Sequence, residues 1–325
     1  MGLGAFGGWD GKLMRYLSDG DLEDLGITPA DVADAIEDAL IRKRDGGLHT
    51  APKSAILPGD GRYMMSTLAV GDYAGLTVLK AVTVAPENPS LGLPAITGAI
   101  MAMDSRTGQL VAVLGADWVT AVRTAGLSAV AARRMANPQA RSVAFVGCGV
   151  QAHSHLAAFS GMFPLAEIRA FGRGAANRDK LCETARGMGL QALSTDDPEE
   201  ALSGADLIVT SVTLDYSIQP FLTTDWMKPG SFAAITDLSI PWHIDSLSAL
   251  DAVIVDDREQ EAESPRKLVD PAHVAGDLTD LVGGQAKVGF APDERKAFAF
   301  RGIALGDFAA TALALERAGI VAATQ

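Results

Sequence analysis

A glycine-rich turn at residues 147–152, which reads Gly-Cys-Gly-Val-Gln-Ala, carries the clearest chemistry in this sequence. It follows a short apolar run, Ser142–Val146, and precedes a helical stretch that extends through Phe159. In this G-x-G-x-x-A pattern the first glycine allows a tight turn, the second lets the backbone approach a pyrophosphate, and the small Ala152 lets the helix pack on the strand. The positive end of the helix favours anionic phosphates. Taken alone, the hexapeptide is also compatible with a tight strand-to-helix turn that binds no ligand.

Two cationic side chains lie in unusually apolar surroundings. Lys80 lies inside the apolar run 75–84, where an unpaired ammonium group would lose its hydration, so it faces either water at a sheet edge or a cleft. Arg123 lies in a predicted helix among Ala, Val, Thr and Gly residues. Such small neighbours let a long guanidinium group reach across to another group, although a solvated arginine is the alternative.

Asp237 and His243 are candidates in the second half of the chain. Asp237 follows the apolar run 231–236 at its carboxyl end, which is where ligands bind in open parallel sheets. The alternative for Asp237 is a helix N-cap. His243 lies six residues later and is a weaker candidate for a cleft. His153 and His155 fall in the helix after the glycine turn, where a histidine is usually packed or solvated.

The elements that must position these residues form two groups. After the glycine turn, apolar runs of strand length alternate with helical stretches, with strands expected at 167–171, 205–212, 231–236 and 252–255 and a helix at 178–187. This alternation indicates a parallel sheet covered on both faces. The sequence therefore predicts an α/β fold containing a Rossmann-type dinucleotide-binding domain.

Before the turn, strands expected at 61–69, 75–84, 95–104 and 109–114 are separated by turns rather than helices. Such strands form an antiparallel or mixed sheet, and hence a second, α+β domain. Three helices flank them, expected at residues 29–45 with Thr28 as N-cap, at 116–136 with a possible break at Gly126, and at 307–319. The last helix should return to the first domain, because no strand follows it to cover its apolar face.

Composition narrows the class of protein. The chain has 325 residues, enough for two domains, and is 48% hydrophobic and 21% charged. A formal net charge of −13, with no basic stripe, argues against nucleic acid as a partner. Cys148 and Cys182 lack the spacing of a metal site or a disulfide framework. Residues 1–12 lack signal-peptide features and no run of about 18 apolar residues occurs, so we expect a cytoplasmic protein with no metal and no membrane partner.

The sequence resembles the ornithine cyclodeaminase and mu-crystallin family, which includes imine reductases and an alanine dehydrogenase branch. Four blocks in the right order carry the resemblance: Leu79–Pro89, Arg123–Ala136, Val143–Phe159 and Phe300–Ala318. The resemblance implies a Rossmann dinucleotide-binding domain at residues 123–303. This domain is inserted in a substrate-binding and dimerisation domain formed by residues 13–122 and 304–325. It also implies a homodimer.

The resemblance implies roles for individual residues. Lys80 matches the substrate-site lysine, Arg123 the arginine that grips the substrate carboxylate, and Asp237 the acid near the reacting carbon. Lys53 falls where relatives usually carry a second arginine of this clamp, and a lysine keeps the charge but loses the bidentate geometry. His243 is kept as a substrate-site candidate. The residues expected at the cofactor are Thr124, Gly147, Gly149, Val150, Gln151, Arg173, Ser211, Val212 and Asp237.

Two departures from the family bear on substrate and cofactor. Cyclodeaminases acting on ornithine use an acidic residue in the strand before the lysine, whereas this chain has Met-Met-Ser-Thr at residues 64–67. Cyclodeamination therefore ranks below reduction of a carbon–nitrogen double bond. NAD-specific Rossmann sites place an acid after the second strand, but here Phe171 is followed by Gly172 and Arg173. Arg173 can pair with a 2′-phosphate, which favours NADP, or stack on adenine while NAD binds.

The sequence thus predicts an NAD(P)H-dependent oxidoreductase that reduces a small α-imino acid to an L-amino acid, or catalyses the reverse. The cations Lys53, Lys80 and Arg123 suit a carboxylate, including a dicarboxylic imino acid such as iminosuccinate. The alternatives are an ornithine- or lysine-type cyclodeaminase and a non-catalytic ligand-binding protein of the crystallin type. An acid beside a cationic clamp counts against the last of these.

Overall fold

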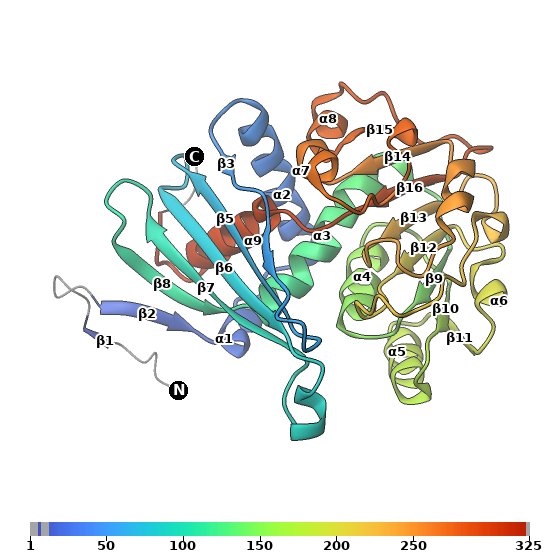
Figure 1. Ribbon diagram of the computed structural model, residues 1–325, viewed down its shortest axis with the longest axis horizontal. Coiled ribbons are helices and arrows are strands. Elements are labelled where there is room, and N and C mark those ends of the chain that lie inside the picture. Colours follow the sequence, from blue (N-terminus) through green and yellow to red (C-terminus); the bar gives the residue numbers. More distant parts are fainter. Residues whose placement is uncertain (1–5, 8–12, 323–325) are drawn as a thin grey trace. The chain divides into compact units, whose positions relative to one another are not determined.

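The computed structural model describes residues 6–7 and 13–322, so most of residues 1–12 lies outside the described residues. The chain divides into two compact units (Figure 1). The first unit contains residues 1–123 and 302–325, and the second contains residues 124–301. The division falls after Arg123 and after Arg301, whereas the sequence suggested residues 122 and 303.

The first unit is built on a mixed sheet with the strand order β1-β2-β8-β7-β6-β5-β3, and β4 also pairs with β5. Its long strands, each antiparallel to the next, are β5 (Tyr63–Gly71), β6 (Leu76–Val84), β7 (Ile96–Asp104) and β8 (Leu110–Gly115). The short strands are β1 (Phe6–Gly7), β2 (Leu13–Leu17), β3 (His49–Thr50) and β4 (Ser54–Ile56). Because β2 lies parallel to β8, the sheet is mixed, which is one of the two arrangements, antiparallel or mixed, that the closely spaced strands predicted.

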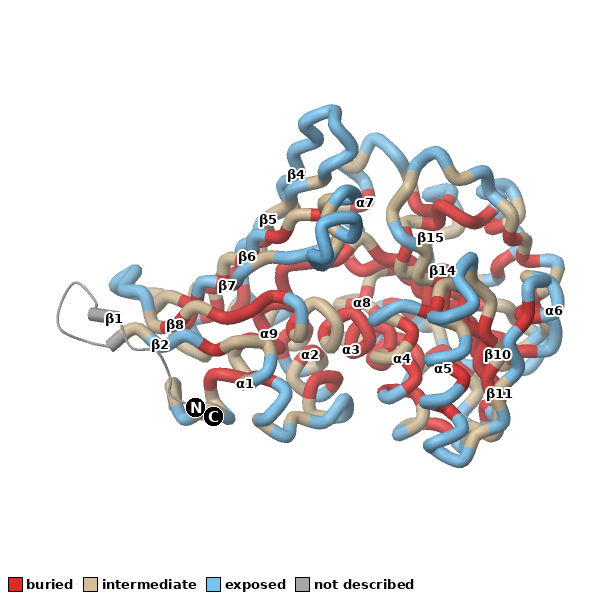
Figure 2. Tube along the Cα trace, turned by 90° about the horizontal axis from the view of Figure 1, so that it is seen from below, coloured by how far each residue is buried: buried red, intermediate tan, exposed pale blue. Residues whose placement is uncertain are grey.

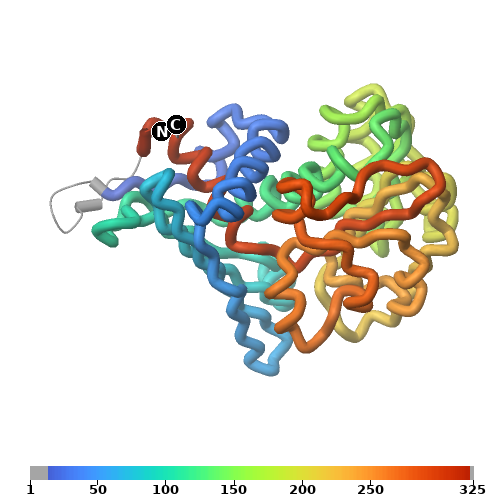
Figure 3. Tube along the Cα trace, turned by 90° about the horizontal axis from the view of Figure 1, so that it is seen from above, coloured from blue at the N-terminus to red at the C-terminus, as the bar shows by residue number. Residues whose placement is uncertain are grey.

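One face of this sheet is covered by helix α9 (Ala304–Arg317), which contacts β5, β6 and helix α2 (Pro29–Arg44) (Figure 1). Figure 3 shows the red C-terminal helix beside the blue α2. Gly71 of β5 permits this packing, since a Cβ there would lie 2.5 Å from the ring of Phe308. The last helix therefore packs within the first unit, as predicted, and it begins three residues before the expected position 307.

Helix α3 (Asp117–Met135) is buried along most of its length (Figure 2). Oδ1 of Asp19, from helix α1 (Asp19–Glu23), accepts a hydrogen bond of 2.7 Å from the backbone N–H of Trp118 in the first turn of α3. The helix continues through Gly126, so the break suggested there does not occur. A single buried glycine costs a helix only about 1 kcal/mol relative to alanine, which packing offsets.

The second unit is a fully parallel sheet with the order β11-β10-β9-β12-β13-β16-β14-β15. Its strands are β9 (Ser142–Val146), β10 (Glu167–Phe171), β11 (Gln191–Thr195), β12 (Leu207–Thr210), β13 (Phe232–Ile235), β14 (Ala252–Val255), β15 (Val274–Asp277) and β16 (Lys296–Ala299). Counted from β9, the first five strands have the 3-2-1-4-5 order of a Rossmann fold. The order reverses between β9 and β12, so the carboxyl ends of these two strands form the switch point where such folds bind ligands.

Three strands of this sheet were not expected from the sequence: β11, β15 and β16. β11 is an edge strand whose residues are mostly exposed, and β15 includes Gly276 and Asp277, so neither reads as an apolar run. β16 has only four residues and begins with Lys296, yet it is fully buried between β13 and β14. In Figure 3 this late, red segment of the chain runs through the second unit before the chain returns to α9.

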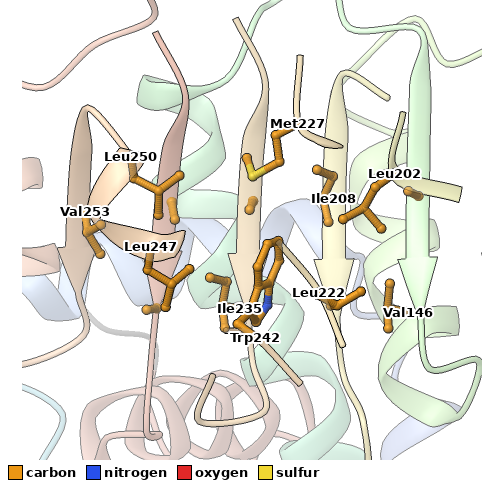
Figure 4. Close-up of a cluster of buried hydrophobic side chains, with 14 of the residues drawn as sticks. Val146, Leu202, Ile208, Leu222, Met227, Ile235, Trp242, Leu247, Leu250 and Val253 are labelled. Carbon is orange, nitrogen blue, oxygen red and sulfur yellow. The ribbon is translucent and has the colours of Figure 1, made fainter. Parts of the chain in front are cut away.

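Both faces of the sheet are buried. Ala144 and Val146 belong to an apolar cluster that includes Trp242, shown in Figure 4, while the alternate residues of β9, Val143 and Phe145, are buried on the opposite face. The helices of the unit are α4 (Val150–Ser160), α5 (Ala175–Gly187), α6 (Pro198–Leu202), α7 (Arg258–Glu263) and α8 (Leu278–Gly283). The short 3-10 helices of the chain are η1 (Asn88–Leu91), η2 (Thr224–Trp226), η3 (Ile244–Ala249) and η4 (Pro271–His273). A sheet buried on both faces leaves its strand ends to carry polar chemistry.

Candidate functional site

The first unit contains a buried charged cluster around Lys80. The Lys80 side chain is 1% exposed, and its Nζ lies 2.6 Å from Oδ1 of Asp307 on α9 and 3.3 Å from Oγ1 of Thr120 on α3. The sequence allowed two positions for Lys80, at a sheet edge facing water or in a cleft. Because the side chain is buried, the first of these is wrong. Asp307 is a charged partner that the sequence analysis missed.

The same carboxylate contacts two further side chains. Nε of Arg123 lies 3.1 Å from Oδ1 of Asp307, and Thr67 donates a hydrogen bond of 2.7 Å to Oδ2. Thr67 lies directly opposite Lys80 in the register of β5 and β6. Gly302, with φ +89°, leaves room for the arginine, since a Cβ there would lie 3.0 Å from Nη1 of Arg123. Strand, helix and the C-terminal segment thus converge on one carboxylate.

The charges of this cluster act strongly on one another. Burial lowers the pKa of Lys80 to about 8, Asp307 opposes this shift, and Arg123 and Lys53 add to it. Burial also acts to raise the pKa of Asp307, but Lys80 and Arg123 outweigh it and hold the pKa below its usual range. Lys53 is half-buried. Among the described residues that act on Lys80, the positive charges outnumber the single carboxylate, so the cluster is suited to bind an anion.

A signal for Asp307 was present in the sequence. It lies in the apolar stretch Ile303–Leu315, where its neighbours are Gly, Ala, Leu, Phe and Thr. The helix was predicted to begin at Asp307 and to bury an apolar face, and no role was assigned to the acid. An acid within a run of apolar residues is rarely buried without a cation, so the question of its partner was open to sequence reasoning.

In the second unit, the glycine turn has the shape that a dinucleotide requires. Gly147 has φ +91°, and a Cβ there would lie 2.6 Å from the carbonyl oxygen of Ser211. Gly149 is the N-cap of α4, and a Cβ there would meet no atom of the described residues within 4 Å. Val150 is 68% exposed. The first glycine is therefore needed for close packing, and the second leaves the helix start open to a phosphate group.

Asp237 lies at the end of β13 and is buried, with 1% of its surface exposed. Its oxygens accept hydrogen bonds of 3.0 Å from Oγ1 of Thr210 and from the backbone N–H of Val212. Burial raises the pKa of Asp237 to about 7, and these hydrogen bonds act in the opposite direction. The N-cap alternative is wrong, since the chain continues as a turn and η3 begins at Ile244. The turn is strained, with Leu238 at φ 58° and Ser239 at φ 56°.

Two arginines lie near the end of β10. Arg173 is exposed, and its charge contributes, after the hydrogen bonds from Ser217, to the lowered pKa of Asp215. Arg178, which the sequence analysis did not single out, donates from Nη1 to the carbonyl oxygen of Gly172 at 2.6 Å and forms an ion pair with Asp196. Arg178 therefore holds the strand end in place, while Arg173 projects from it.

The remaining candidates stay predictions. His243 is exposed, and its backbone N–H donates to the carbonyl oxygen of Leu222 at 2.9 Å. Thr124 is buried within α3, and Gln151 lies in the first turn of α4. Ser211 donates from Oγ to the carbonyl oxygen of Gly147 at 3.3 Å, which ties the ends of β9 and β12 together. In the described parts of the chain, no helix is long and apolar enough to cross a membrane, and no group of three His, Cys, Asp or Glu side chains is placed to hold a metal ion.

The chain is similar in sequence to a known protein family and to several of its members. The model of the ornithine cyclodeaminase/mu-crystallin family matches residues 20–320. The ketimine reductase mu-crystallin of Mus musculus is 31% identical over 209 residues, a match spanning 63% of this chain and 65% of the mouse protein, just under two thirds of its length. The Delta(1)-pyrroline-2-carboxylate reductase of Paracoccus denitrificans is 30% identical over 278 residues, covering 80% of this chain and 86% of that protein.

Solved structures show the same fold. The Delta(1)-pyrroline-2-carboxylate reductase of Thermococcus litoralis was solved with NADH and L-proline. It superposes on this chain with a TM-score of 0.86 at 22% identity, and the match covers 95% of this chain and 100% of the reductase chain. An archaeal alanine dehydrogenase dimer with bound NAD superposes with a TM-score of 0.83 at 23% identity, covering 94% and 97% of the two chains.

Proposed function

Because the chain belongs to the ornithine cyclodeaminase/mu-crystallin family, we propose that it is an NAD(P)H-dependent oxidoreductase that reduces the carbon–nitrogen double bond of a small α-imino acid, or catalyses the reverse reaction. The observation that carries this proposal is the buried cluster of Lys80, Arg123 and Asp307. Its excess of positive charge suits a substrate carboxylate, and Lys80 holds a proton that an imine nitrogen can accept.

The residues of the glycine turn fit the nucleotide cofactor. Gly147 permits the tight turn, and the open N-terminus of α4 at Gly149 and Val150 would hold the pyrophosphate. Ser211, Val212 and Asp237, which are linked at the carboxyl ends of β12 and β13, would line the cofactor with Thr124 and Gln151. When bound, the cofactor supplies the hydride.

Arg173 supports NADP over NAD, since its guanidinium group can pair with the 2′-phosphate that NADP carries and NAD lacks. It is exposed at the end of β10, where an NAD-specific site would carry an acid. Asp196, which directly follows the adjacent strand β11, forms an ion pair with Arg178. In the alternative, Arg173 stacks on adenine and NAD binds.

At the substrate, Arg123 and Lys53 would fix a carboxylate, which orients the reacting carbon. Lys80 would complete this grip or transfer a proton from Nζ. Asp237 would stabilise charge on the iminium group or exchange its proton, and its pKa of about 7 suits either role. A dicarboxylic imino acid, such as iminosuccinate, would match the cationic excess better than a monocarboxylic one.

The outer face of the first unit's sheet supports a homodimer. A row of apolar residues crosses five strands in register: Leu68, Leu79, Met101, Val113 and Tyr16. Leu68 is 40% and Met101 39% exposed, and a continuous apolar row of this kind is typical of an interface. A second copy of the chain is the occupant we propose, since it presents the same apolar row. A monomer in sedimentation equilibrium at micromolar concentration would contradict this.

The decisive experiment is a substrate panel with both NADH and NADPH. Imines generated from oxaloacetate, pyruvate or glyoxylate with ammonia, together with cyclic imines, should consume the reduced cofactor in stopped-flow measurements. Failure with every imine would reject the proposal.

Two rival functions give different results. Ammonia release from ornithine or lysine without added reductant would favour a cyclodeaminase, which the uncharged Thr67 opposite Lys80 argues against. Tight cofactor binding without turnover would favour a non-catalytic protein of the crystallin type. The costly burial of Lys80 and Asp307 argues against pure binding.

A further inference from the structure

We propose that Asp307 is a positioning residue of the substrate site: its carboxylate holds Lys80 and Arg123 on one oxygen atom and keeps Nζ of Lys80 an ammonium group. For its catalytic consequence this inference rests on the proposed function, whereas the charge state of Lys80 can be tested without turnover.

The contacts leave Asp307 little freedom. Oδ1 lies 2.6 Å from Nζ of Lys80 and 3.1 Å from Nε of Arg123, while Oδ2 accepts the hydrogen bond from Thr67. The side chains of Lys80, Asp307 and Arg123 are 1%, 2% and 9% exposed. Because both oxygens are engaged and buried, the carboxylate fixes the separation of the two cations.

Charge balance explains why this contact matters. One carboxylate carries one negative charge against the two positive charges of Lys80 and Arg123 beside it, which favours an anionic substrate at this cluster. Without Asp307, Lys80 and Arg123 would face each other in a buried place. Arginine keeps its charge under all ordinary conditions, so lysine is the group that would lose its proton. A neutral Lys80 could neither attract a carboxylate nor donate a proton.

The charged groups on neighbouring elements do not replace Asp307. α9 packs on β5, β6 and α2. On α2, Asp31 pairs with Arg317 at the far end of α9, while Asp38 and Arg42 act on Tyr73, whose ring lies against Phe308. Among the described residues, Asp307, Arg123 and Lys53 act on Lys80, and of these three Asp307 favours the ammonium form.

The test follows the ¹⁵Nζ resonance of Lys80 through a pH titration of the full-length protein labelled with ¹⁵N-lysine. The signal is assigned by its disappearance in Lys80→Arg. In the wild-type protein we expect Lys80 to titrate near pH 8. In Asp307→Asn the midpoint should fall by at least about one pH unit, because the favourable charge is lost. In the matched control Thr67→Val, which removes a neutral hydrogen bond to the same carboxylate, it should move by less than about 0.3 units.

Kinetics give the second readout. In Asp307→Asn, kcat/KM for the imino acid at pH 7.5 should fall at least about threefold from the lost ammonium form of Lys80 alone, and the basic limb of its pH profile should move to lower pH with the Lys80 titration. The KM for the nucleotide should change less than about twofold, because its glycine turn belongs to the other unit. If Asp307 had only a structural role, Asp307→Asn would lower the melting temperature and would not shift the basic limb of the kcat/KM profile.

An unchanged Lys80 midpoint in Asp307→Asn overturns the inference. If Asp307→Asn does not fold, Asp307→Glu carries the test: it keeps the charge, so the Lys80 midpoint should stay within about 0.5 pH units of wild type, while the displaced carboxylate should lower kcat/KM for the imino acid. A Lys80 midpoint that falls by a unit or more although the charge is kept then overturns the inference. If the wild-type protein reduces no imine, the proposed function fails, and the titration still decides what Asp307 does.

Discussion

The two units each bury an aspartate, and the two aspartates behave in opposite ways. Asp307 lies beside Lys80 and Arg123, and its pKa is held below the usual range. Asp237 is hydrogen-bonded to neutral groups of Thr210 and Val212, and burial raises its pKa to about 7. Burial alone therefore favours the protonated acid, and a neighbouring cation reverses this preference.

The difference extends to the two candidate binding surfaces. The cluster of the first unit is charged and buried, whereas the turn of the second unit is shaped by its glycines and is open at Gly149 and Val150. Substitutions in the charged cluster of the first unit should accordingly act by removing charge. Substitutions in the glycine turn of the second unit should act by filling space.

The largest effect is expected from Lys80→Met. It removes the ammonium group, so kcat/KM for the imino acid should fall about 10³-fold. It also leaves Asp307 with Arg123 as its remaining charged partner, so the free energy of unfolding should fall by about 3 kcal/mol. Steady-state kinetics and urea denaturation measure the two effects. Lys287→Met, at an exposed position of the second unit, is the control and should change neither. Full activity in Lys80→Met would contradict the expectation that the first unit depends on the charge of this cluster.

Gly147→Ala and Gly149→Ala test the role of shape in the second unit. At Gly147 the added Cβ would lie 2.6 Å from the carbonyl oxygen of Ser211 at a positive φ, so the free energy of unfolding should fall by about 1–3 kcal/mol. At Gly149 the Cβ has open space, so stability should hold while the affinity for NAD(P)H falls. Denaturation and fluorescence titration separate the two. Equal destabilisation by both substitutions would contradict the geometry.

Arg173→Ala and Arg178→Ala sharpen the same comparison, since here the second unit is expected to use charge. Loss of Arg173 should raise the KM for NADPH about tenfold and leave the KM for NADH nearly unchanged. Arg178 holds the carbonyl oxygen of Gly172, so its loss should weaken both cofactors alike. If Arg173→Ala leaves the ratio of the two KM values unaltered, the NADP preference is wrong.

The smallest effect concerns Asp237. Its pKa is raised from 3.8 to about 7 on folding, so the folded state binds this proton more tightly than the unfolded chain. The stabilisation is complete below about pH 4 and is lost as pH rises through 7. Relative to Asp237→Asn, the wild-type protein should therefore lose about 1 kcal/mol or more of unfolding free energy between pH 4 and 7. Asp307 acts in the opposite sense, since its stabilisation is lost as pH falls below 3.8. Parallel pH profiles for wild type and Asp237→Asn would show that Asp237 does not titrate in this range.

The sequence by itself determined the local features of this protein. The glycine turn at Gly147, the capping box of Thr28 and Asp31 and the long strands of the first unit all follow from patterns within a few residues. Caps, turns and hydrophobic periodicity act over such short spans, so they can be read without knowing the fold. Lys80 and Arg123 were also recognised, because a charge among apolar residues requires an explanation.

Tertiary structure alone decided which groups meet. Asp307 lies 227 positions from Lys80 in the chain, and although its apolar neighbours indicate that it needs a cation, they do not indicate which one. The insertion of β16 between β13 and β14 likewise depends on sheet pairing across the whole unit. The same holds for Asp237, whose position was predicted but whose hydrogen bonds to Thr210 and Val212 form only when β12 and β13 lie side by side. These contacts join residues that are far apart in the sequence and close only in the folded chain. The residues between the two partners therefore do not predict which groups will meet.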